Sequence, residues 1–279
     1  MEKTLIIIPA YNVAEHISSL LSQLIKYKNN CLIVDDGSTD DTNKVINKER
    51  FNSIRIRHNL GVSGATVVGL EYALRKGFEK VVLMDADGQH DPEDLDNFFD
   101  ALHNFDMVFA NRFNSREFIP TCKIVSNAFA SMLYNDVSGC YIPDIACGYK
   151  AFKISKELYT YLRSSKGYSI IYRLINYAIL KKISVCFIPT KAIYYDNNLL
   201  FTQTCELVSL FSSVLELGDE ITISKALKKK IDNVLNCIDI KSDFEIILCK
   251  TKFYAFYLKK YEGYIIQSSL KDVHSYYEK

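Results

Sequence analysis

Residues 80–90 read KVVLMDADGQH, and this stretch decides the fold. The mainly apolar run 80–84 suits a buried strand, and it leads directly into two carboxylates that are one residue apart. If extended geometry continues past the run, alternation places Asp85 and Asp87 on the same face. Hard divalent cations bind such oxygens together with substrate phosphates, whereas a solvated acidic turn is the alternative. An EF-hand is excluded, because its glycine belongs at loop position 6.

Similar apolar runs recur along the chain, and segments with helical spacing separate them. The expected strands cover 5–8, 31–34, 53–57, 80–84, 106–110 and 185–188, and the expected helices cover 14–27, 64–76, 121–134 and 168–181, with a helix start at 38–42 and a loop followed by a strand in 144–152. This pattern indicates a buried, mostly parallel sheet in an α/β protein. Ligands of such sheets bind at the carboxyl ends of the strands, where polar residues stand here.

Size and composition indicate a globular protein and exclude other classes. The chain has 279 residues, of which 48% are hydrophobic, and its net charge is only +1. Disorder would need low hydrophobicity with high net charge, and nucleic-acid binding would need a basic face. No apolar run approaches the roughly 18 residues of a membrane span. The eight cysteines include no Cys-x-x-Cys pair, so we expect no zinc site and, without a recognisable signal peptide, reduced thiols in a cytoplasmic protein.

Two further polar turns follow expected strands and could hold a nucleoside. The turn Pro9-Ala10-Tyr11-Asn12 can present backbone groups and one aromatic ring. In Asp35-Asp36-Gly37-Ser38, a carboxylate could accept hydrogen bonds from a ribose or a base, and a helix N-cap is the alternative. The stretch Asn59-Leu60-Gly61-Val62-Ser63-Gly64 precedes a helix, but it fits neither the dinucleotide fingerprint nor the P-loop, so alone it indicates a tight turn.

Charged residues in the middle of the chain are candidates for phosphate binding. Arg112 follows an expected strand and Lys123 comes soon after it, so either could contact phosphate oxygens or remain solvated. The apolar loop 144–150 places a carboxylate, a glycine and a cation close together. His90 and His103 have no partner at a metal-ligand spacing, so we expect them to be structural or solvated.

Together these motifs resemble those of the inverting family-two glycosyltransferases. The resemblance spans about residues 4–155 and rests on the order and spacing of four motifs: Ile8-Pro9-Ala10-Tyr11-Asn12, Val34-Asp35-Asp36-Gly37-Ser38-Thr39-Asp40, Asn59-Leu60-Gly61, and Asp85-Ala86-Asp87-Gly88-Gln89-His90-Asp91-Pro92. It implies a GT-A fold, which is Rossmann-like, with a mostly parallel sheet. We expect this catalytic domain at 1–200 and a mainly helical extension at 201–279.

The later segments are most similar to the polyprenyl-phosphate branch, which includes the dolichyl-phosphate mannose and glucose synthases. The features that carry this likeness are Asn111-Arg112-Phe113, Lys123 ahead of Ser126, and Asp144 ahead of Cys147-Gly148-Tyr149-Lys150-Ala151-Phe152. Lys123 stands where an arginine is common in the branch, and lysine cannot grip phosphate at two points as arginine does. The Cys-Gly-aromatic-Lys form is closer to the glucosyl members, which hints at UDP-glucose.

The resemblance also implies roles for individual residues. It places the donor nucleotide sugar at eight positions: Pro9, Ala10, Tyr11, Asn12, Asp36, Gly64, Asp85 and Ala86. Asp87, with Asp85 and Gln89, would ligate Mg²⁺ or Mn²⁺. Arg112 and Lys123 would meet the phosphate of a lipid acceptor, and Asp144 would lie near the sugar and the acceptor.

Three activities remain open from the sequence. Transfer of a hexose to a polyprenyl phosphate needs no general base, because the second pKa of a phosphate monoester is about 6. Transfer to a saccharide hydroxyl, as in cell-surface polysaccharide synthesis, needs a base, for which Asp144 is the candidate. The third reading is a catalytically silent binder of nucleotide sugars.

The end of the chain carries an excess of positive charge. Residues 221–279 hold eleven Lys and seven acids, a net charge of +4 that leaves −3 on residues 1–220. Within this end, 244–266 mixes aromatic side chains with lysines, which suits either a membrane interface or an ordinary amphipathic helix. The expected location is therefore cytoplasmic, with possible peripheral contact on the inner face of the membrane, and the sequence leaves the oligomeric state open.

Overall fold

The structure is a computed structural model that describes residues 3–114, 121–191, 193, 204–220, 229 and 231. The chain divides into two compact units, Met1–Glu220 and Ile221–Lys279. Nearly all described residues belong to the first unit. That unit extends past residue 200, because helix α8 (Thr204–Glu220) packs against α7 (Ser169–Leu180) and α5 (Thr121–Ser138).

A seven-stranded sheet forms the centre of the first unit, in the order β3-β2-β1-β4-β6-β5-β7. Its strands are β1 Thr4–Ala10, β2 Cys31–Asp35, β3 Ser53–Arg55, β4 Lys80–Leu83, β5 Met107–Asn111, β6 Lys150–Lys153 and β7 Val185–Pro189. All neighbouring pairs are parallel except those that β6 makes with β4 and β5. The mostly parallel sheet expected from the sequence is therefore confirmed.

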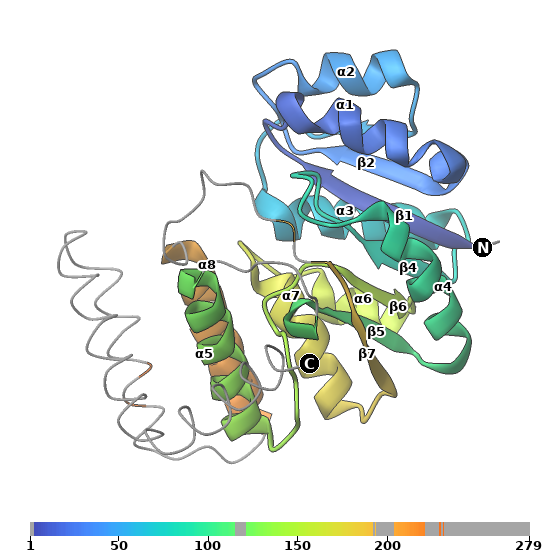
Figure 1. The fold of residues 1–279 in the computed structure, drawn as a ribbon. Coiled ribbons are helices and arrows are strands. Elements are labelled where there is room, and N and C mark those ends of the chain that lie inside the picture. The colour runs from blue at the N-terminus through green and yellow to red at the C-terminus, as the bar shows by residue number, and fades with distance from the viewer. Residues whose placement is uncertain are drawn as a thin grey trace, which may run out of the picture. The chain divides into compact units, whose positions relative to one another are not determined.

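Helices cover both faces of this sheet (Figure 1). One face carries α1 Ala14–Gln23, the 3₁₀ turn η1 Ile25–Asn30, α2 Thr42–Glu49 and α4 Leu95–Asn104, the last preceded by η2 Pro92–Asp94. The other face carries α3 Gly61–Arg75 with α6 Lys156–Leu162 and α7 beside it. A further 3₁₀ turn, η3 Arg112–Asn114, follows β5.

The core explains why the apolar runs form strands. β1 is buried along nearly its whole length, because alternate side chains enter the layers on both sides. Ile8 packs in the cluster with Ile17 and Leu21 of α1 and Phe98 of α4. Each such aliphatic side chain contributes about 1.5–3 kcal/mol when fully buried. On the other face, a Cβ at Gly69 would lie 2.4 Å from a methyl carbon of Ile7, so glycine lets α3 approach β1 closely.

The elements agree with the sequence expectations in type and differ at some ends. The helix expected over 14–27 stops at Gln23 and continues as the 3₁₀ turn η1, and the strand expected over 53–57 stops at Arg55. The helices α4 and α6 were not foreseen. A signal for α4 is present in Asp91-Pro92, because Asp91 caps the turn that leads into α4 by accepting a hydrogen bond from the Glu93 N–H.

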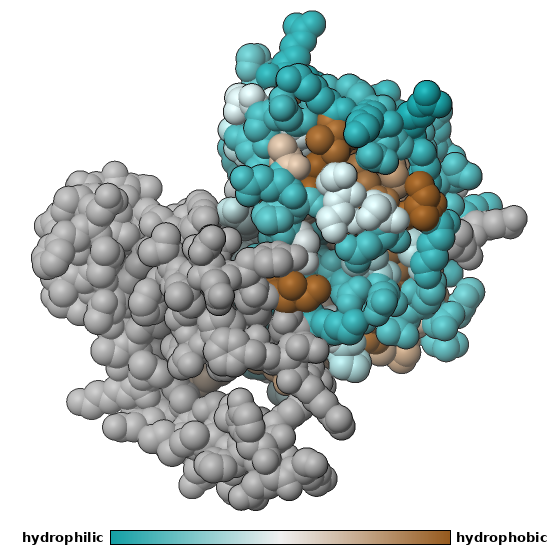
Figure 2. Space-filling model, turned by 45° about the horizontal axis from the view of Figure 1, so that its top comes forward, coloured by the Kyte–Doolittle hydropathy of each residue, from teal (hydrophilic) through white to brown (hydrophobic). Residues whose placement is uncertain are grey.

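The described residues give no sign of a membrane-spanning segment. Within the described ranges, no helix combines the length and the apolar character that crossing a bilayer requires. Figure 2 shows a face on which the described residues are mostly hydrophilic, with hydrophobic side chains only in small areas between them. The stretch 244–266, for which a membrane interface was one expectation, lies outside the described residues.

Candidate active site

The carboxyl ends of β1, β2, β4 and β5 meet at one edge of the sheet. β6 runs in the opposite direction between β4 and β5, so its beginning lies at this same edge. Lys150, the first residue of β6, pairs with Leu83 on one side and Phe109 on the other. The antiparallel strand thus brings Gly148 and Lys150 among the polar residues that follow the parallel strands.

The turns after β1 and β2 are joined by hydrogen bonds. Asp36 donates its backbone N–H to the carbonyl oxygen of Ala10 at 2.8 Å. Asn12 has a φ of 52°. Its side-chain oxygen accepts the backbone N–H of Thr39 at 2.8 Å, and its backbone N–H donates to Ser38 Oγ at 3.0 Å. Pro9 to Asn12 and Asp36, which the sequence assigned to the donor nucleoside, therefore lie together.

Asp36 also connects to the third motif. Its Oδ1 accepts the backbone N–H of Leu60 at 2.8 Å, directly before α3. Burial raises the pKa of this carboxyl, and the N–H groups of Leu60 and Gly61 partly offset that effect. Two large side chains beside Asp36 remain exposed, Tyr11 at 46% and Leu60 at 53%. Asp36 is thus a buried carboxylate, held by two segments that each carry a large exposed side chain.

Two glycines shape this region. Gly37 has a φ of +75°, and a Cβ there would lie 3.2 Å from the backbone of residues 58 and 59, so only glycine fits without strain. Gly64 lies in the first turn of α3, where a Cβ would be 2.4 Å from Cβ of Leu60. Gly64 therefore leaves room for the side chain of Leu60, with which any Cβ at position 64 would clash.

The acidic motif follows β4, which ends at Leu83. Ala86 is buried, whereas Asp85 and Asp87 on either side of it are partly exposed. Asp87 Oδ1 accepts the N–H of Gln89 at 2.9 Å, which closes a tight turn. The pKa of Asp87 is raised, first by burial and then by the charge of Asp85. The charge of Asp85 thus acts against ionisation of Asp87.

Burial raises the pKa of Asp85 to about 6, although the charges of Arg112 and Lys150 act to lower it. The side chain keeps 39% of its surface exposed. Gly148 explains how the carboxylate fits, because a Cβ at that position would lie only 2.7 Å from Asp85 Oδ2. A partly exposed carboxylate with a raised pKa is a candidate ligand for a cation.

Arg112 and Asp144 form a close ion pair at the end of β5. Nε of Arg112 donates to Asp144 Oδ2 at 2.8 Å, and a terminal guanidinium nitrogen donates to Oδ1 at 2.9 Å. The Arg112 backbone N–H donates to Oδ2 as well, at 3.1 Å. Burial acts to raise the pKa of Asp144, but the charge and hydrogen bonds of Arg112 outweigh it and hold the pKa below its ordinary value. Asp144 is thus a fixed, fully buried anion.

Lys150 is a buried cation beside this pair. Its Nζ donates to the carbonyl oxygen of Ile145 at 3.4 Å and lies 4.6 Å from the centre of the Phe109 ring. Burial lowers the pKa of Lys150 to about 8, although the neighbouring Cys147 and Asp144 act to raise it. The sequence drew attention to this loop, but it gave Lys150 no role.

Not every expected residue can be placed. Lys123 lies in α5, but its side chain is outside the part of the chain that the structure describes. Whether it approaches Arg112 therefore stays a prediction. The other expected residues form two groups at one edge of the sheet, a nucleoside group around Asp36 and a charged group around Asp85 and Asp144.

His90 makes contacts that the sequence analysis did not foresee. Of the two expected roles, structural or solvated, the structure shows the structural one, because Nδ1 of His90 accepts the backbone N–H of Asp85 at 3.0 Å. The ring is buried and stacks on Tyr149, with centroids 4.7 Å apart. Its partners are a backbone group of the same turn and the ring of Tyr149, just before β6, so a search for metal-ligand spacing could not reveal them. The other histidine, His103, is exposed on α4, as expected.

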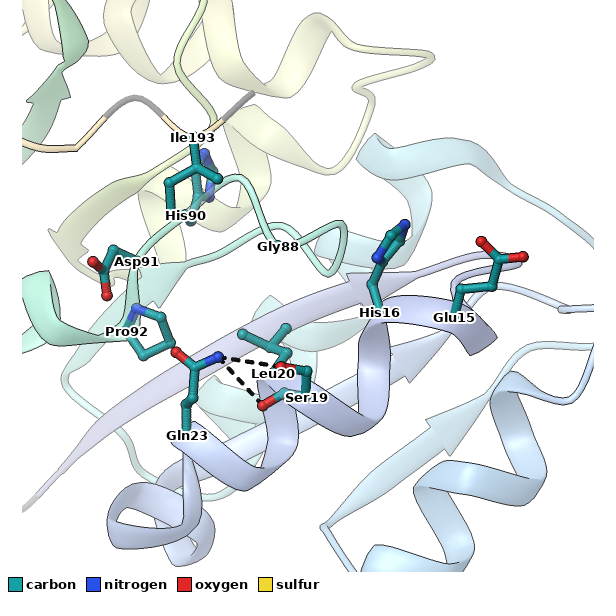
Figure 3. Close-up of a pocket in the computed structure, with 10 residues that line it drawn as sticks. All are labelled: Glu15, His16, Ser19, Leu20, Gln23, Gly88, His90, Asp91, Pro92 and Ile193. Carbon is teal, nitrogen blue, oxygen red and sulfur yellow. Dashed lines mark hydrogen bonds between the residues drawn. The ribbon is translucent and has the colours of Figure 1, made fainter. Parts of the chain in front are cut away.

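A cavity of about 210 Å³ adjoins the acidic turn on the side of α1 (Figure 3). Polar side chains of α1, among them His16 and Ser19, face the turn that contains Gly88 and Asp91. Asp36, Asp87 and Asp144 do not line it. The cavity therefore reaches Gly88, His90 and Asp91 of the acidic turn, but not these three carboxylates.

The acidic turn fits a cation that the protein shares with a ligand. Within the described residues, no three His, Cys, Asp or Glu side chains gather as a complete metal site. Mg²⁺ in particular is held in proteins by one or two carboxylates plus substrate phosphates. Asp85 and Asp87 supply this number of carboxylates, and both have raised pKa values that a bound cation would reverse.

Comparisons with known proteins agree with this arrangement. Residues 5–192 match the family model of glycosyl transferase family 2. The chain is 32% identical over 219 residues to a UDP-N-acetylglucosamine–dolichyl-phosphate N-acetylglucosaminyltransferase of Methanococcus voltae, an alignment that covers 70% of this chain and 87% of that protein. It is 28% identical over 202 residues to the polyprenol monophosphomannose synthase of Mycolicibacterium smegmatis, covering 67% and 76%.

A solved structure with a similar fold is the glucosyl-3-phosphoglycerate synthase of Mycobacterium tuberculosis in complex with Mn²⁺ and UDP-glucose. Its TM-score is 0.59 at 18% identity, and the match covers 80% of each chain. At this identity the likeness concerns the fold, and it confirms the GT-A architecture. The family match extends over about two thirds of the chain and includes both groups of site residues. This chain is therefore a glycosyltransferase and belongs to glycosyl transferase family 2.

Proposed function

We propose that this glycosyltransferase is metal-dependent and moves a hexose from a UDP- or GDP-sugar to a polyprenyl phosphate. In the reaction, a phosphate oxygen of the acceptor bonds to the anomeric carbon, and the bond from that carbon to the diphosphate breaks with inversion. The nucleoside diphosphate leaves with the bonding electrons. No proton has to be removed from the acceptor, because a phosphate monoester is already an anion near neutral pH.

The ion pair of Asp144 and Arg112 is the observation that supports this acceptor most directly. A general base for a hydroxyl acceptor needs a carboxylate oxygen that can take up a proton. Both oxygens of Asp144 accept hydrogen bonds from Arg112, and its pKa is held low, so protonation is unfavourable. Asp144 is better suited to holding the Arg112 guanidinium at the strand end, where a phosphate can meet a positive charge.

The relatives support the same acceptor class. The names of two of them specify a dolichyl phosphate acceptor and a polyprenol monophosphomannose product. The family resemblance assigns Arg112 and Lys123 to binding an acceptor phosphate, and a polyprenyl phosphate would supply that anion. A saccharide hydroxyl remains the second acceptor to be tested. Contact with a membrane surface, as a lipid acceptor would require, belongs to this proposal.

For the donor, the nucleoside would lie against Asp36 and the turn from Pro9 to Asn12. Asp85 and Asp87, with Gln89 beside them, would hold Mg²⁺ or Mn²⁺. The cation, when bound, neutralises charge that develops on the leaving diphosphate. The presence of Mn²⁺ and a UDP-sugar in the enzyme of similar fold is consistent with this choice.

The experiment has two stages and uses the full chain. Thermal shift with a panel of UDP- and GDP-sugars and Mn²⁺ identifies the donor. The identified donor is then incubated with undecaprenyl phosphate in detergent, with an EDTA control and a parallel reaction containing oligosaccharide acceptors. We expect a metal-dependent glycosyl phospholipid. Transfer only to an oligosaccharide would reject the lipid acceptor, and no turnover with any donor would favour a silent binder.

A further inference from the structure

The imidazole of His90 lies beneath the acidic turn and contacts Asp85 at two points. Nδ1 accepts the Asp85 backbone N–H at 3.0 Å, so this nitrogen carries no proton and the proton of the neutral ring is on Nε2. Nε2 lies 3.5 Å from Oδ2 of the same Asp85. One ring therefore contacts both the backbone and the carboxylate of a residue assigned to the donor and metal site.

Other groups fix the position of the ring. His90 stacks on Tyr149 at an interplanar angle of 12°, and Phe98 packs on Tyr149 with centroids 4.3 Å apart. The Tyr149 hydroxyl donates to the carbonyl oxygen of Asp91 at 3.2 Å. The acidic turn is thus attached, just beyond His90, to the residue before β6, and the imidazole has little freedom to rotate.

Gly148 limits the space around the same carboxylate oxygen. A Cβ at Gly148 would approach Asp85 Oδ2 to 2.7 Å. The Asp85 carboxylate therefore lies beside the Gly148 backbone with the His90 Nε2–H nearby. This confinement determines the direction of the carboxylate before any ligand binds.

We propose that His90 is a positioning residue, which holds the backbone and carboxylate of Asp85 so that Asp85 and Asp87 bind the cation together. This inference rests on the proposed metal site. Groups that orient metal-binding carboxylates typically change metal affinity by about 10- to 100-fold when they are lost. His90 itself is not placed in contact with the cation or the donor.

The test is the affinity of the full chain for Mn²⁺, measured by electron paramagnetic resonance in the presence of UDP or GDP, whichever stabilises the protein more. In His90→Asn, the shorter amide can still accept the Asp85 N–H but does not reach the carboxylate. We expect a folded protein whose Mn²⁺ dissociation constant rises by about 10-fold or more. The matched control is His103→Asn, on the exposed surface of α4, which should leave the dissociation constant unchanged.

Three results decide the inference. A folded His90→Asn protein that binds Mn²⁺ within twofold of the parent overturns it. Asp87→Ala tests the metal site separately from His90. If Asp87→Ala still binds Mn²⁺, the proposed metal site is wrong. If Asp87→Ala loses Mn²⁺ binding while His90→Asn binds Mn²⁺ normally, only the role of His90 is rejected. If His90→Asn does not fold, the tautomer of His90 in the parent is measured by long-range ¹H–¹⁵N spectra, assigned with variants in which the other histidines are replaced. The inference requires the Nε2–H tautomer, and the Nδ1–H tautomer overturns it.

Discussion

Arg112 donates to both carboxylate oxygens of Asp144, at 2.8 and 2.9 Å, and its backbone N–H adds a third hydrogen bond. The two side chains come from segments that are 32 residues apart in the sequence, and the carboxylate is fully buried. The pair fixes a positive charge at the end of β5, beside the acidic turn that follows β4. This relationship favours an anionic acceptor over one that must be deprotonated.

Asp144→Asn should reduce transfer without abolishing it, because the proposed reaction uses no general base. The amide loses the charge that orients Arg112, and removing one partner of a buried pair typically costs about 3–5 kcal/mol of stability. Steady-state kinetics at a temperature well below the melting midpoint measure the effect on turnover. Near-total loss of turnover in a protein that still binds donor would instead indicate that Asp144 acts as a base.

Gly148→Ala should weaken the binding of Mn²⁺ and donor, since its Cβ would displace the carboxylate of Asp85. The matched control is Gly69→Ala, whose Cβ clashes with Ile7 in the core, away from the site. Both variants should unfold at lower temperature, but only Gly148→Ala should raise the dissociation constant for Mn²⁺. Equal Mn²⁺ affinity in the two proteins would show that Gly148 does not shape the site.

Lys150→Met should stabilise the protein at pH 7. The folded-state pKa of Lys150 is lowered from 10.5 to about 8, so the folded protein binds fewer protons than the unfolded chain between these values. The free energy of unfolding of the parent therefore rises as the pH rises from about 8 to 10.5. Below pH 8, the buried ammonium lowers that free energy by on the order of 3 kcal/mol. Urea denaturation at pH 7 and pH 10 measures this: the advantage of the variant should be large at pH 7 and small at pH 10. A less stable variant at pH 7 would contradict this account.

Ser63→Ala should cost about 1 kcal/mol of stability. Ser63 Oγ accepts the N–H of Ile170 at 3.1 Å, and so it caps the first turn of α7 from a different helix, while its own N–H donates to the Gly167 carbonyl oxygen at 3.1 Å. Loss of such a cap typically costs 0.5–2 kcal/mol. Chemical denaturation of the variant is compared with that of Ser212→Ala, an exposed serine of α8, which should be neutral. Equal stability of the two would exclude a capping role.

The sequence predicted the sheet mainly because β1, β2, β4 and β5 are nearly continuous apolar runs, a pattern that is visible without knowledge of their neighbours. The order of the strands and the antiparallel direction of β6 depend on contacts between distant segments, which no local pattern encodes. The same distinction applies to the site. Asp36, Asp85 and Asp87 could be found because each follows an apolar strand, and the sheet then brings these strand ends together.

The partners of the site residues could not be predicted in the same way. The bonds from Arg112 to Asp144 join a strand end to a distant loop, and nothing in their spacing indicates that they meet. His90 binds a backbone group and stacks on Tyr149, contacts that have no signature in the sequence. Lys150 appeared as one cation in a loop, and only the fold shows that it is buried beside Asp144.

The most direct test of the central claim is calorimetric titration of Mn²⁺ with UDP or GDP into the Asp87→Ala protein. The account predicts that cation-dependent nucleotide binding disappears, while the control Asp100→Ala, on the exposed face of α4, binds as the parent does. Binding by Asp87→Ala that still requires Mn²⁺ and has the affinity of the parent would contradict a cation held by the two carboxylates after β4.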